Sequence, residues 1–485
     1  MQWWVLKKRL HVSWIIAGLC CALLVGVWLR QYVSIEVFGS NVWLVAGCGL
    51  VSAGLVRNYR FLLPLVILGG LMLGLWRGTA AESELTDIRA LQHQAVTISG
   101  HVREDVDTDS AGATVLRLDS LMREGQVVHG TLWVSGFSQL EIKRGDVVDV
   151  TGKIGNGFGS FAGTMFQAEI ASVKRPQPGD IARQIRDWIS DSIRLAIPSP
   201  ESSLGIGFLV GQKRALPADL VEALQIAGLT HVVVASGYNL TILVRLARRL
   251  FERVSKYLSM LAASGMIAIF IAITGLSPSM SRAGLVAGLS LLAWYYGRRF
   301  HPLVLLPLAA AVTVMINPSY AWGDLGWQLS FASFAGVMIV APLFHRYFFG
   351  DKNPGTVRQI LGETIAAVIV TAPILMNAFG QFSNVSVIAN LLILPFVPLA
   401  MLLTFVAGIG ALMFPMAATL FGTPAQLLLG YMISTAKYLA GLPWAVSTVS
   451  FAGWAIAIYY VVLAAICVYM WRQTKFDLAS ANIVQ

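Results

Sequence analysis

The stretch GLTHVVVASGYN, residues 228–239, places His231, Ser236 and Asn239 within a run that is otherwise apolar. Polar side chains at the depth of a lipid bilayer are costly, so they usually face the interior of a helix bundle or a watery cavity. The stretch therefore predicts a pore or a buried polar site inside a membrane protein.

The composition of the whole chain supports this interpretation. Of its 485 residues, 56% are hydrophobic and 12% are charged, whereas soluble domains carry about 25% charged residues. These values exclude a soluble globular protein. The four cysteines, Cys20, Cys21, Cys48 and Cys467, all fall in apolar runs, so neither a disulfide framework nor zinc-site spacing is expected. We expect no metal and no cofactor.

Apolar runs long enough to cross a hydrocarbon core of about 30 Å occur in two groups. They begin near Ser13, Val42 and Phe61, and again near Leu229, Tyr257, Ala283, Pro302, Leu325, Thr364, Val385, Ala425 and Phe451. The expected fold is a polytopic α-helical membrane protein with about twelve spans. No small-residue cleavage pattern follows the first run, which is expected to remain as an anchor.

Lysine and arginine cluster in alternate loops between these runs. The clusters are Lys7/Lys8/Arg9, Arg57/Arg60, Arg245/Arg248/Arg249/Arg253/Lys256, Arg298/Arg299, Arg346/Lys352/Arg358 and Arg472/Lys475. Because positively charged loops stay in the cytoplasm, both termini are expected inside the cell and the segment from Arg77 to about Asp180 outside. The expected location is the cytoplasmic membrane.

The segment between the two groups of spans has a different character. Five runs rich in β-forming residues are separated by Gly, Asp and Glu turns, and most of them alternate apolar and polar positions. They cover residues 95–102, 114–121, 126–136, 146–154 and 165–173. Five strands in about a hundred residues predict a small closed β-barrel of the OB type.

The charge of this barrel bears on whether it binds nucleic acid, as OB-folds often do. Between residues 77 and 180 there are ten Lys and Arg against fourteen Asp and Glu, whereas a groove for a single strand is normally basic and rich in aromatics. We therefore favour a module that organises or guards the membrane part. The alternative is local contact with DNA through Lys143, Arg144, Lys153, Lys174 and Arg175.

Five stretches, taken in order, resemble the motifs of a known family. They are LVGQKRALP (residues 209–217), GLTHVVVASG (228–237), GLSPSMSRAG (275–284), NPSYAWGDLGWQLSFASFAG (317–336) and FGQFSNVSVIANLLILP (379–395). Together with the leading spans and the external OB-like insert, they resemble the ComEC family of competence DNA-uptake channels. Five ordered motifs are more specific than any one of them.

The resemblance implies transport of single-stranded DNA across the cytoplasmic membrane during natural transformation. The chain departs from the family pattern at Asn239, where many members carry a histidine. Many members also carry a C-terminal metallo-β-lactamase-like nuclease domain, but this sequence contains no HxHxDH-type cluster. Any nuclease is therefore expected to be a separate polypeptide.

The expected partners are single-stranded DNA, the lipid bilayer and a separate DNA receptor outside the cell. The membrane potential opposes entry of a polyanion by about 2.3 kcal/mol per charge and 100 mV. The only Gly-Lys pair, Gly152-Lys153, lies in the β insert, and no phosphate-binding loop motif occurs. A separate cytoplasmic ATP-driven motor or strand-binding protein is expected to supply the work.

We expect four parts along the chain. Residues 1–76 form three transmembrane helices, 77–180 the OB-like domain, 181–228 amphipathic helices at the interface, and 229–485 the competence-type channel domain. The apolar residues of 181–197 recur at helical spacing. This predicts an amphipathic helix that lies on the outer surface of the membrane or simply joins the domains.

Residues that interrupt apolar runs with polarity or a glycine are the candidates for the DNA path, and the neutral ones, Gln328, Ser330, Gln381 and Asn390, would let a polyanion slide without trapping it. The candidates are His231, Ser236, Gly237, Asn239, Arg282, Asp324, Gln328, Ser330, Gln381 and Asn390. Helix packing is the alternative role for the uncharged residues. Arg282 and Asp324 are expected to face the cavity, paired with each other, with anchoring at the membrane interface as the alternative. Arg245, Arg248, Arg249, Arg253 and Lys256 are the candidates for a cytoplasmic basic exit, with lipid binding as the alternative.

Two other classes of protein compete with a DNA channel. One is a transporter of ions or small molecules. The other is an intramembrane hydrolase that uses Ser236, His231 and Asp324 as nucleophile, base and orienting acid. On one regular helix, His231 and Ser236 would point about 140° apart, so we expect no enzyme and no catalytic residues.

Overall fold

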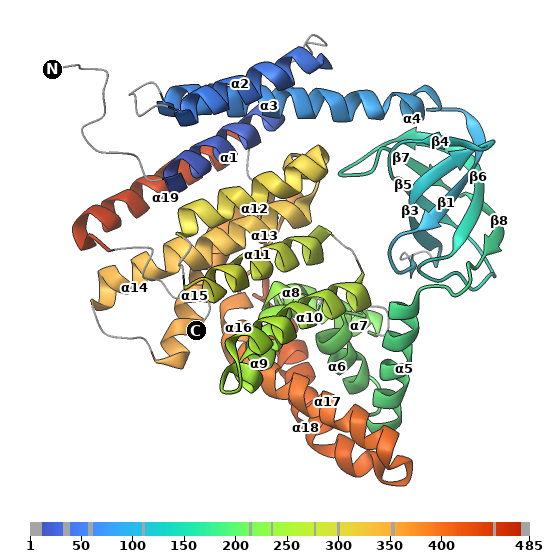
Figure 1. Cartoon of the computed structure of the whole chain (residues 1–485). Helices are drawn as coiled ribbons and strands as arrows, with labels where there is room; N and C mark the ends of the chain where they lie inside the picture. The colour runs from blue at the N-terminus through green and yellow to red at the C-terminus, as the bar shows by residue number, and fades with distance from the viewer. Residues whose placement is uncertain are drawn as a thin grey trace. The chain divides into compact units, whose positions relative to one another are not determined.

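A computed structural model of the protein describes residues 12–32, 39–56, 62–108, 112–212, 216–233, 236–275, 278–297, 301–350, 355–449 and 453–476 (Figure 1). The chain divides into two compact units. The first comprises Met1–Asp180 with Leu303–Gln328, and the second comprises Ile181–Pro302 with Leu329–Gln485.

The first unit begins with three apolar helices, α1 (Val12–Leu29), α2 (Asn41–Val56) and α3 (Leu62–Glu84). Glycines bring α1 and α3 together: a Cβ added to Gly74 would lie 2.2 Å from the carbonyl oxygen of Leu23 and 3.0 Å from the Cα of Gly26. Backbones approach this closely only where residues are small, as in membrane helix pairs generally. The three leading helices therefore form one bundle.

A later helix belongs to the same unit. The guanidinium of Arg77 on α3 donates to the carbonyl oxygens of Met315 (2.8 Å) and Ile316 (3.1 Å), which end helix α12 (Pro302–Ile316). These carbonyls have no partner within their own helix, so the arginine caps α12. The 3₁₀ turn η3 (Pro318–Ala321) follows, and its Tyr320 is buried against α1.

The remainder of the first unit is a β-barrel (Figure 1). Its strands are β1 (Ala95–Val102), β2 (Asp107–Thr108), β3 (Thr114–Arg123), β4 (Gln126–Val128), β5 (Leu132–Gly136), β6 (Val147–Asn156), β7 (Gly163–Phe166) and β8 (Glu169–Lys174). Five of them close in the order β1–β3–β5–β7–β6, with β6 pairing back to β1 and β5 parallel to β7. Alternate side chains fill the interior, among them Ile98, Leu116 and Val150.

The barrel confirms the predicted fold class. All five predicted runs form strands, and two of them divide. The third breaks into β4 and β5 at Gly130, whose φ is +127°, and the fifth breaks into β7 and β8 at Gln167, whose φ is +53°. Both residues leave the extended region, so the ladder cannot continue through them.

Two contacts hold the barrel against the helices of its own unit. The short helix α4 (Thr86–Ala90) places Ile88, which is fully buried, in the barrel core. At a second point the loop before β7 meets the turn after η3. A Cβ on Gly323 would lie 2.0 Å from the carbonyl oxygen of Gly159, whose own φ is +61°. The two backbones therefore touch directly, and only glycine fits at Gly323.

The second unit is helical and carries one short β-ribbon. Its elements are α5 (Ile181–Ala196), α6 (Glu201–Val210), α7 (Ala218–Ile226), α8 (Thr230–Val233), α9 (Gly237–Glu252), α10 (Lys256–Thr274), α11 (Pro278–Tyr295), the π-helix η4 (Gly336–Val340), α14 (Ala341–Phe349), α15 (Thr356–Phe379), β9 (Gln381–Ser383), α16 (Ser386–Ile393), η5 (Leu394–Phe396), α17 (Val397–Met413), η6 (Pro415–Ala417), α18 (Ala418–Ala440), β10 (Val446–Thr448) and α19 (Gly453–Thr474). Helix α13 (Leu325–Ala335) begins in the first unit and ends in the second.

Helix α5 is the predicted amphipathic helix, but it is arranged unlike a helix of a soluble protein. Ile181, Ile185 and Trp188 are exposed, whereas Arg183 and Arg186 are buried and both bind Asp187. The helix lies close against α18, since a Cβ on Gly422 would clash with the carbonyl of Ala196. Ile181, Ile185 and Trp188 therefore remain available to lipid, while Arg183 and Arg186 face protein and Arg194 is exposed.

Fewer helices of the described residues are long enough to cross a membrane than the predicted number of about twelve spans. Within the described residues, eight helices are long and apolar enough to cross a membrane: Val12–Leu29, Leu63–Glu84, Lys256–Thr274, Leu325–Phe349, Val357–Phe379, Ser386–Met413, Pro415–Ala440 and Gly453–Thr474. A ninth is added if the bent pair Ala218–Ile226 and Thr230–Glu252 counts as one span. The runs near Val42 and Pro302 form helices of only 16 and 15 residues.

Candidate functional site

The stretch around Gly228–Asn239 lies where several short helices meet in the second unit. Helix α6 ends at Gly211, whose φ is +74°, and α7 begins after Pro217. Helix α7 in turn ends before Gly228, whose φ is +70°, and the helical stretch that follows is bent from it by 112°. Glycine and proline thus break the chain into pieces too short to span a bilayer.

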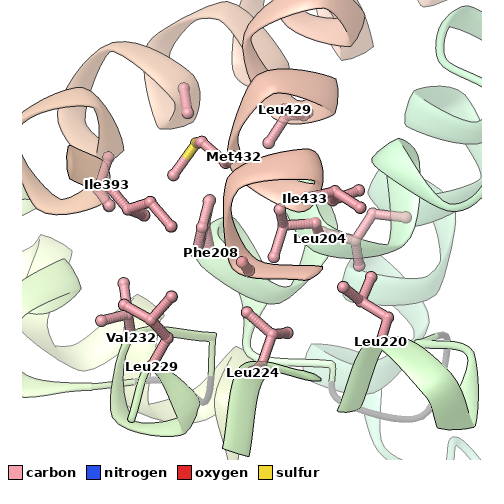
Figure 2. Close-up of a cluster of buried hydrophobic side chains, with 14 of the residues drawn as sticks. Leu204, Phe208, Leu220, Leu224, Leu229, Val232, Ile393, Leu429, Met432 and Ile433 are labelled. Atoms are coloured by element: carbon pink, nitrogen blue, oxygen red, sulfur yellow. The ribbon is translucent and has the colours of Figure 1, made fainter. Parts of the chain in front are cut away.

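The breaks surround an apolar cluster (Figure 2). Phe208 of α6 lies at its middle, with Ile393 of α16 and Met432 of α18 on one side and Leu229 and Val232 on the other. A small cavity of about 10 Å³ remains between these side chains. Residues from three of the five motif stretches or their immediate neighbours therefore converge here.

A second contact joins two motif stretches beside this cluster. A Cβ on Gly228 would lie 2.6 Å from the Cβ of Ser386, and the hydroxyl of Ser383 donates to the carbonyl oxygen of Ile226. The turn after α7 is thereby fixed against the start of α16. The neighbouring Asn384 is exposed and donates outside this contact, to the carbonyl oxygen of Trp444 at 2.8 Å next to the β9–β10 ribbon.

Asn239 is the most deeply buried of the predicted path residues. Its side chain is 0% exposed, and its amide nitrogen donates to the carbonyl oxygens of Phe208 and Val232, each at 3.2 Å. These two hydrogen bonds tie α9 to the ends of α6 and α8. Such a contact is expected if Asn239 serves in helix packing, the alternative to lining the DNA path. Its carbonyl oxygen Oδ1 accepts no hydrogen bond from the described residues.

Asn390 on α16 also has a buried amide oxygen that accepts no hydrogen bond from the described residues. The residue as a whole is 4% exposed. Buried polar atoms are nearly always paired in folded proteins. The two amide oxygens therefore mark polar positions beside the apolar cluster that the present arrangement leaves unsatisfied.

The other residues of the opening stretch do not share one regular helix. His231 is exposed on α8, which ends at Val233, while Ser236 is extended and caps α9 by accepting a hydrogen bond from the backbone N–H of Asn239 at 3.3 Å. Gly237 is the first residue of α9. The expected geometry of a single helix through His231 and Ser236 is therefore wrong, and the serine at the N-cap of α9 is the sequence signal of the break.

The remaining predicted path residues belong to both units. Arg282 is buried on α11 in the second unit, whereas Asp324 and Gln328 lie in the first unit. Asp324 caps α13 by accepting from the N–H of Trp327, and Gln328 donates to the carbonyl oxygen of Trp322 at 3.2 Å. Ser330 is exposed on α13 and Gln381 is exposed on β9. The pairing of Arg282 with Asp324 remains a prediction.

The basic cluster at the end of α9 is organised by aromatic rings that sequence reasoning missed. The guanidinium of Arg248 lies 5.1 Å from the ring centre of Trp294, and the ammonium of Lys256 lies 5.6 Å from the same ring. Arg248 is 6% exposed, whereas Arg249 and Arg253 are exposed. Cation–π contacts therefore hold Arg248 within the fold, and the cations beyond it face outward. Trp294 lies 46 residues from Arg248 in the chain, so no local pattern joins them.

Most barrel cations considered for DNA contact are bound to carboxylates. The pairs are Arg144–Asp180, Arg175–Asp146, Lys143–Glu141 and Lys174–Asp149. Arg144 is only 5% exposed, and Lys153 is exposed. Hydrogen bonds from Ser172 and Ser99 lower the pKa of Asp149 below its ordinary value. The barrel surface around these residues carries balanced charge.

Several predictions concern segments outside the described residues. They are residues 213–215 of the first motif, 234–235 of the second, 276–277 of the third, and the cations Lys7, Lys8, Arg9, Arg57, Arg60, Arg298, Arg299 and Lys352.

The fold and the site together define a polytopic membrane protein with a small closed barrel and a cluster of broken helices, an arrangement that transporters use to build binding sites within a membrane. A family model described as "Competence protein" matches residues 208–473, which is more than half of the chain. The chain therefore belongs to the competence protein family, and the recognition of its motifs is confirmed.

A characterised relative supports this assignment. The chain is 28% identical over 220 residues to ComE operon protein 3 of Bacillus subtilis (strain 168). The aligned region covers 43% of this chain and 27% of the relative, so it spans about a quarter of that protein's length. No solved structure matches the chain.

Proposed function

We propose that this protein conducts single-stranded DNA across the cytoplasmic membrane during natural transformation. Membership of the competence protein family supports a role in DNA uptake. The observation that carries the proposal is the meeting of motif segments at broken helices around Asn239 and Asn390. Unwound backbone is tolerated at membrane depth only beside protein or water, so such breaks favour a path for a polar substrate.

The chemistry of the candidate path fits a polyanion better than a bound cation or a catalytic reaction. Asn239 and Asn390 are neutral amides, which offer hydrogen bonds without trapping phosphates. Ser236 already serves as the cap of α9, which gives it a role other than that of a nucleophile. We therefore propose a channel function, driven by a separate cytoplasmic motor or strand-binding protein.

The barrel is proposed to lie outside the cell and to hold the entrance in place. Its direct contact with the turn at Gly323, beside Asp324, supports a positioning role. Its paired charges favour this role over strand binding by the barrel cations.

The basic cluster yields a prediction with an internal control. Changing Arg249 and Arg253 together to glutamine should leave the amount of protein unchanged and lower transformation several-fold, because both cations are exposed at the proposed exit. Arg248→Gln should instead lower protein abundance, because it removes a buried cation–π contact worth about 0.5–2 kcal/mol. Immunoblots and transformation counts separate the two effects. Unchanged transformation in the double variant would leave lipid binding as the role of this cluster.

Orientation can be tested by thiol labelling in a background without the native cysteines. We expect Lys153→Cys in the barrel to react with an impermeant reagent in intact cells, and Gly355→Cys, before α15, to react only after lysis. Both residues are exposed, so access to the reagent depends on the side of the membrane. Labelling of Gly355→Cys in intact cells would reverse the orientation.

The proposed function itself is tested by deletion and complementation. Cells that lack the protein should still bind DNA at their surface but give no transformants, and the intact gene should restore transformation. Normal transformation in the deletion strain would refute the proposal.

A further inference from the structure

The apolar cluster in Figure 2 is buried where the broken helices meet. Phe208 is 1% exposed, Val232 is 1% exposed and Ile393 is 3% exposed. The cavity between the cluster's side chains is about 10 Å³ in volume and is lined by apolar residues. A space of this size and character offers water no hydrogen-bond partners and stays dry, so neither ions nor a DNA strand can pass in this arrangement.

Two polar side chains lie beside the cluster. Asn239 binds the carbonyl oxygens of Phe208 and Val232, and Asn390 lies three residues before Ile393, on the same side of α16. Each leaves a buried Oδ1 without a hydrogen bond from the described residues. An arrangement that admits water at the cluster would satisfy both oxygens.

The elements around the cluster are suited to a small rearrangement. Helices α6, α7, α8 and α16 have 10, 9, 4 and 8 residues. Gly211 and Gly228, both at positive φ, end two of them. Short rigid pieces joined at such points can shift about hinges without unfolding.

We infer that this apolar cluster is the closed gate of the DNA path, an inference that rests on the proposed function. In the closed state, the side chains of α6 and α8 meet those of α16 and α18 and keep the membrane sealed. Opening separates the two sides and exposes the Oδ1 atoms of Asn239 and Asn390 to water. Hydrophobic constrictions in channels close by this kind of dewetting.

The test is a leak of ions in the absence of DNA. Val232→Thr keeps the shape of the side chain but places a hydroxyl in the gate. Purified full-length protein in liposomes loaded with potassium should release the ion at least tenfold faster than wild type. Val244→Thr is the matched control, because Val244 is also a buried valine, at 6% exposure, but belongs to the separate cluster of α9, α10 and α11. It should release potassium at the wild-type rate.

The outcomes separate the gate from the proposed function. Potassium release by Val232→Thr at the wild-type rate, at equal protein content, would overturn the gate whatever the result of transformation. Equal leaks from Val232→Thr and Val244→Thr would also overturn it, because any polar change in the fold would then have the same effect. Failure of the proposed function would appear as normal transformation in the deletion strain and would leave the leak measurement unaffected.

Discussion

Replacing Asn239 with leucine should reduce transformation at least a hundredfold. The change removes the two hydrogen bonds that tie α9 to Phe208 and Val232 and leaves both carbonyl groups buried. Each group that loses its partner costs about 1–3 kcal/mol, and the broken helices around the cluster lose their common attachment. Transformation frequency, normalised to the amount of protein in the membrane, measures the effect.

Two further variants define the cause. Asn239→Asp should fail as severely as leucine, since a carboxylate has the same shape but cannot donate to the two carbonyls. Asn384→Leu is the control, because Asn384 also donates two hydrogen bonds, to Trp444 and Ser447, but is exposed. It should transform within a few-fold of wild type. Full transformation by Asn239→Leu at normal abundance would show that DNA uptake does not depend on Asn239.

Gly323→Ala should displace the barrel and reduce transformation at least tenfold. The added methyl group would lie 2.0 Å from the carbonyl oxygen of Gly159 and 2.5 Å from its carbonyl carbon, so main chain must move. Flexible side chains can yield to such a clash, but backbone in two fixed turns cannot do so cheaply. Limited proteolysis of the barrel in membranes should be faster in the variant.

The contact offers its own controls. Gly159→Ala should act in the same direction, because its Cβ would lie 3.0 Å from the carbonyl oxygen of Gly323 and its φ of +61° disfavours a side chain. Gly362→Ala on α15 should change neither proteolysis nor transformation, since a Cβ there meets no heavy atom within 4 Å. A Gly323→Ala protein with wild-type proteolysis and transformation would show that the barrel is not held at this point.

The barrel and the long spans were predictable from sequence because their patterns are local. Alternation along residues 95–102 or 146–154 follows from one buried face of a strand, and Gly130 accounts for the division that the pattern did not reveal. The excess in the predicted number of spans has a physical cause as well. Runs such as 302–316 are apolar throughout, but the helix ends after 15 residues where Asn317 and Pro318 begin a 3₁₀ turn.

The site was less predictable, because its organisation depends on contacts between distant segments. Asn239 was recognised as unusual, but its partners Phe208 and Val232 take part through backbone carbonyls that every residue has. The apolar residues of the cluster could not be told apart from other apolar residues by sequence, because 56% of the chain is hydrophobic. Arg248 is buried and Arg249 is exposed, and this difference depends on the contact of Arg248 with Trp294 on another helix. Ser236 did carry a local signal, that of a helix cap, which indicates the break before α9.

The central claim, that the protein carries a DNA strand through the membrane, is tested most directly by following labelled DNA. Wild-type cells, deletion cells and deletion cells that express Asn239→Leu should receive the same end-labelled duplex, followed by external nuclease and separation of cytoplasm from envelope. The account predicts nuclease-resistant single strands in the cytoplasm of wild-type cells alone, with equal surface binding in all three. Labelled single strands in the cytoplasm of the deletion cells would contradict it.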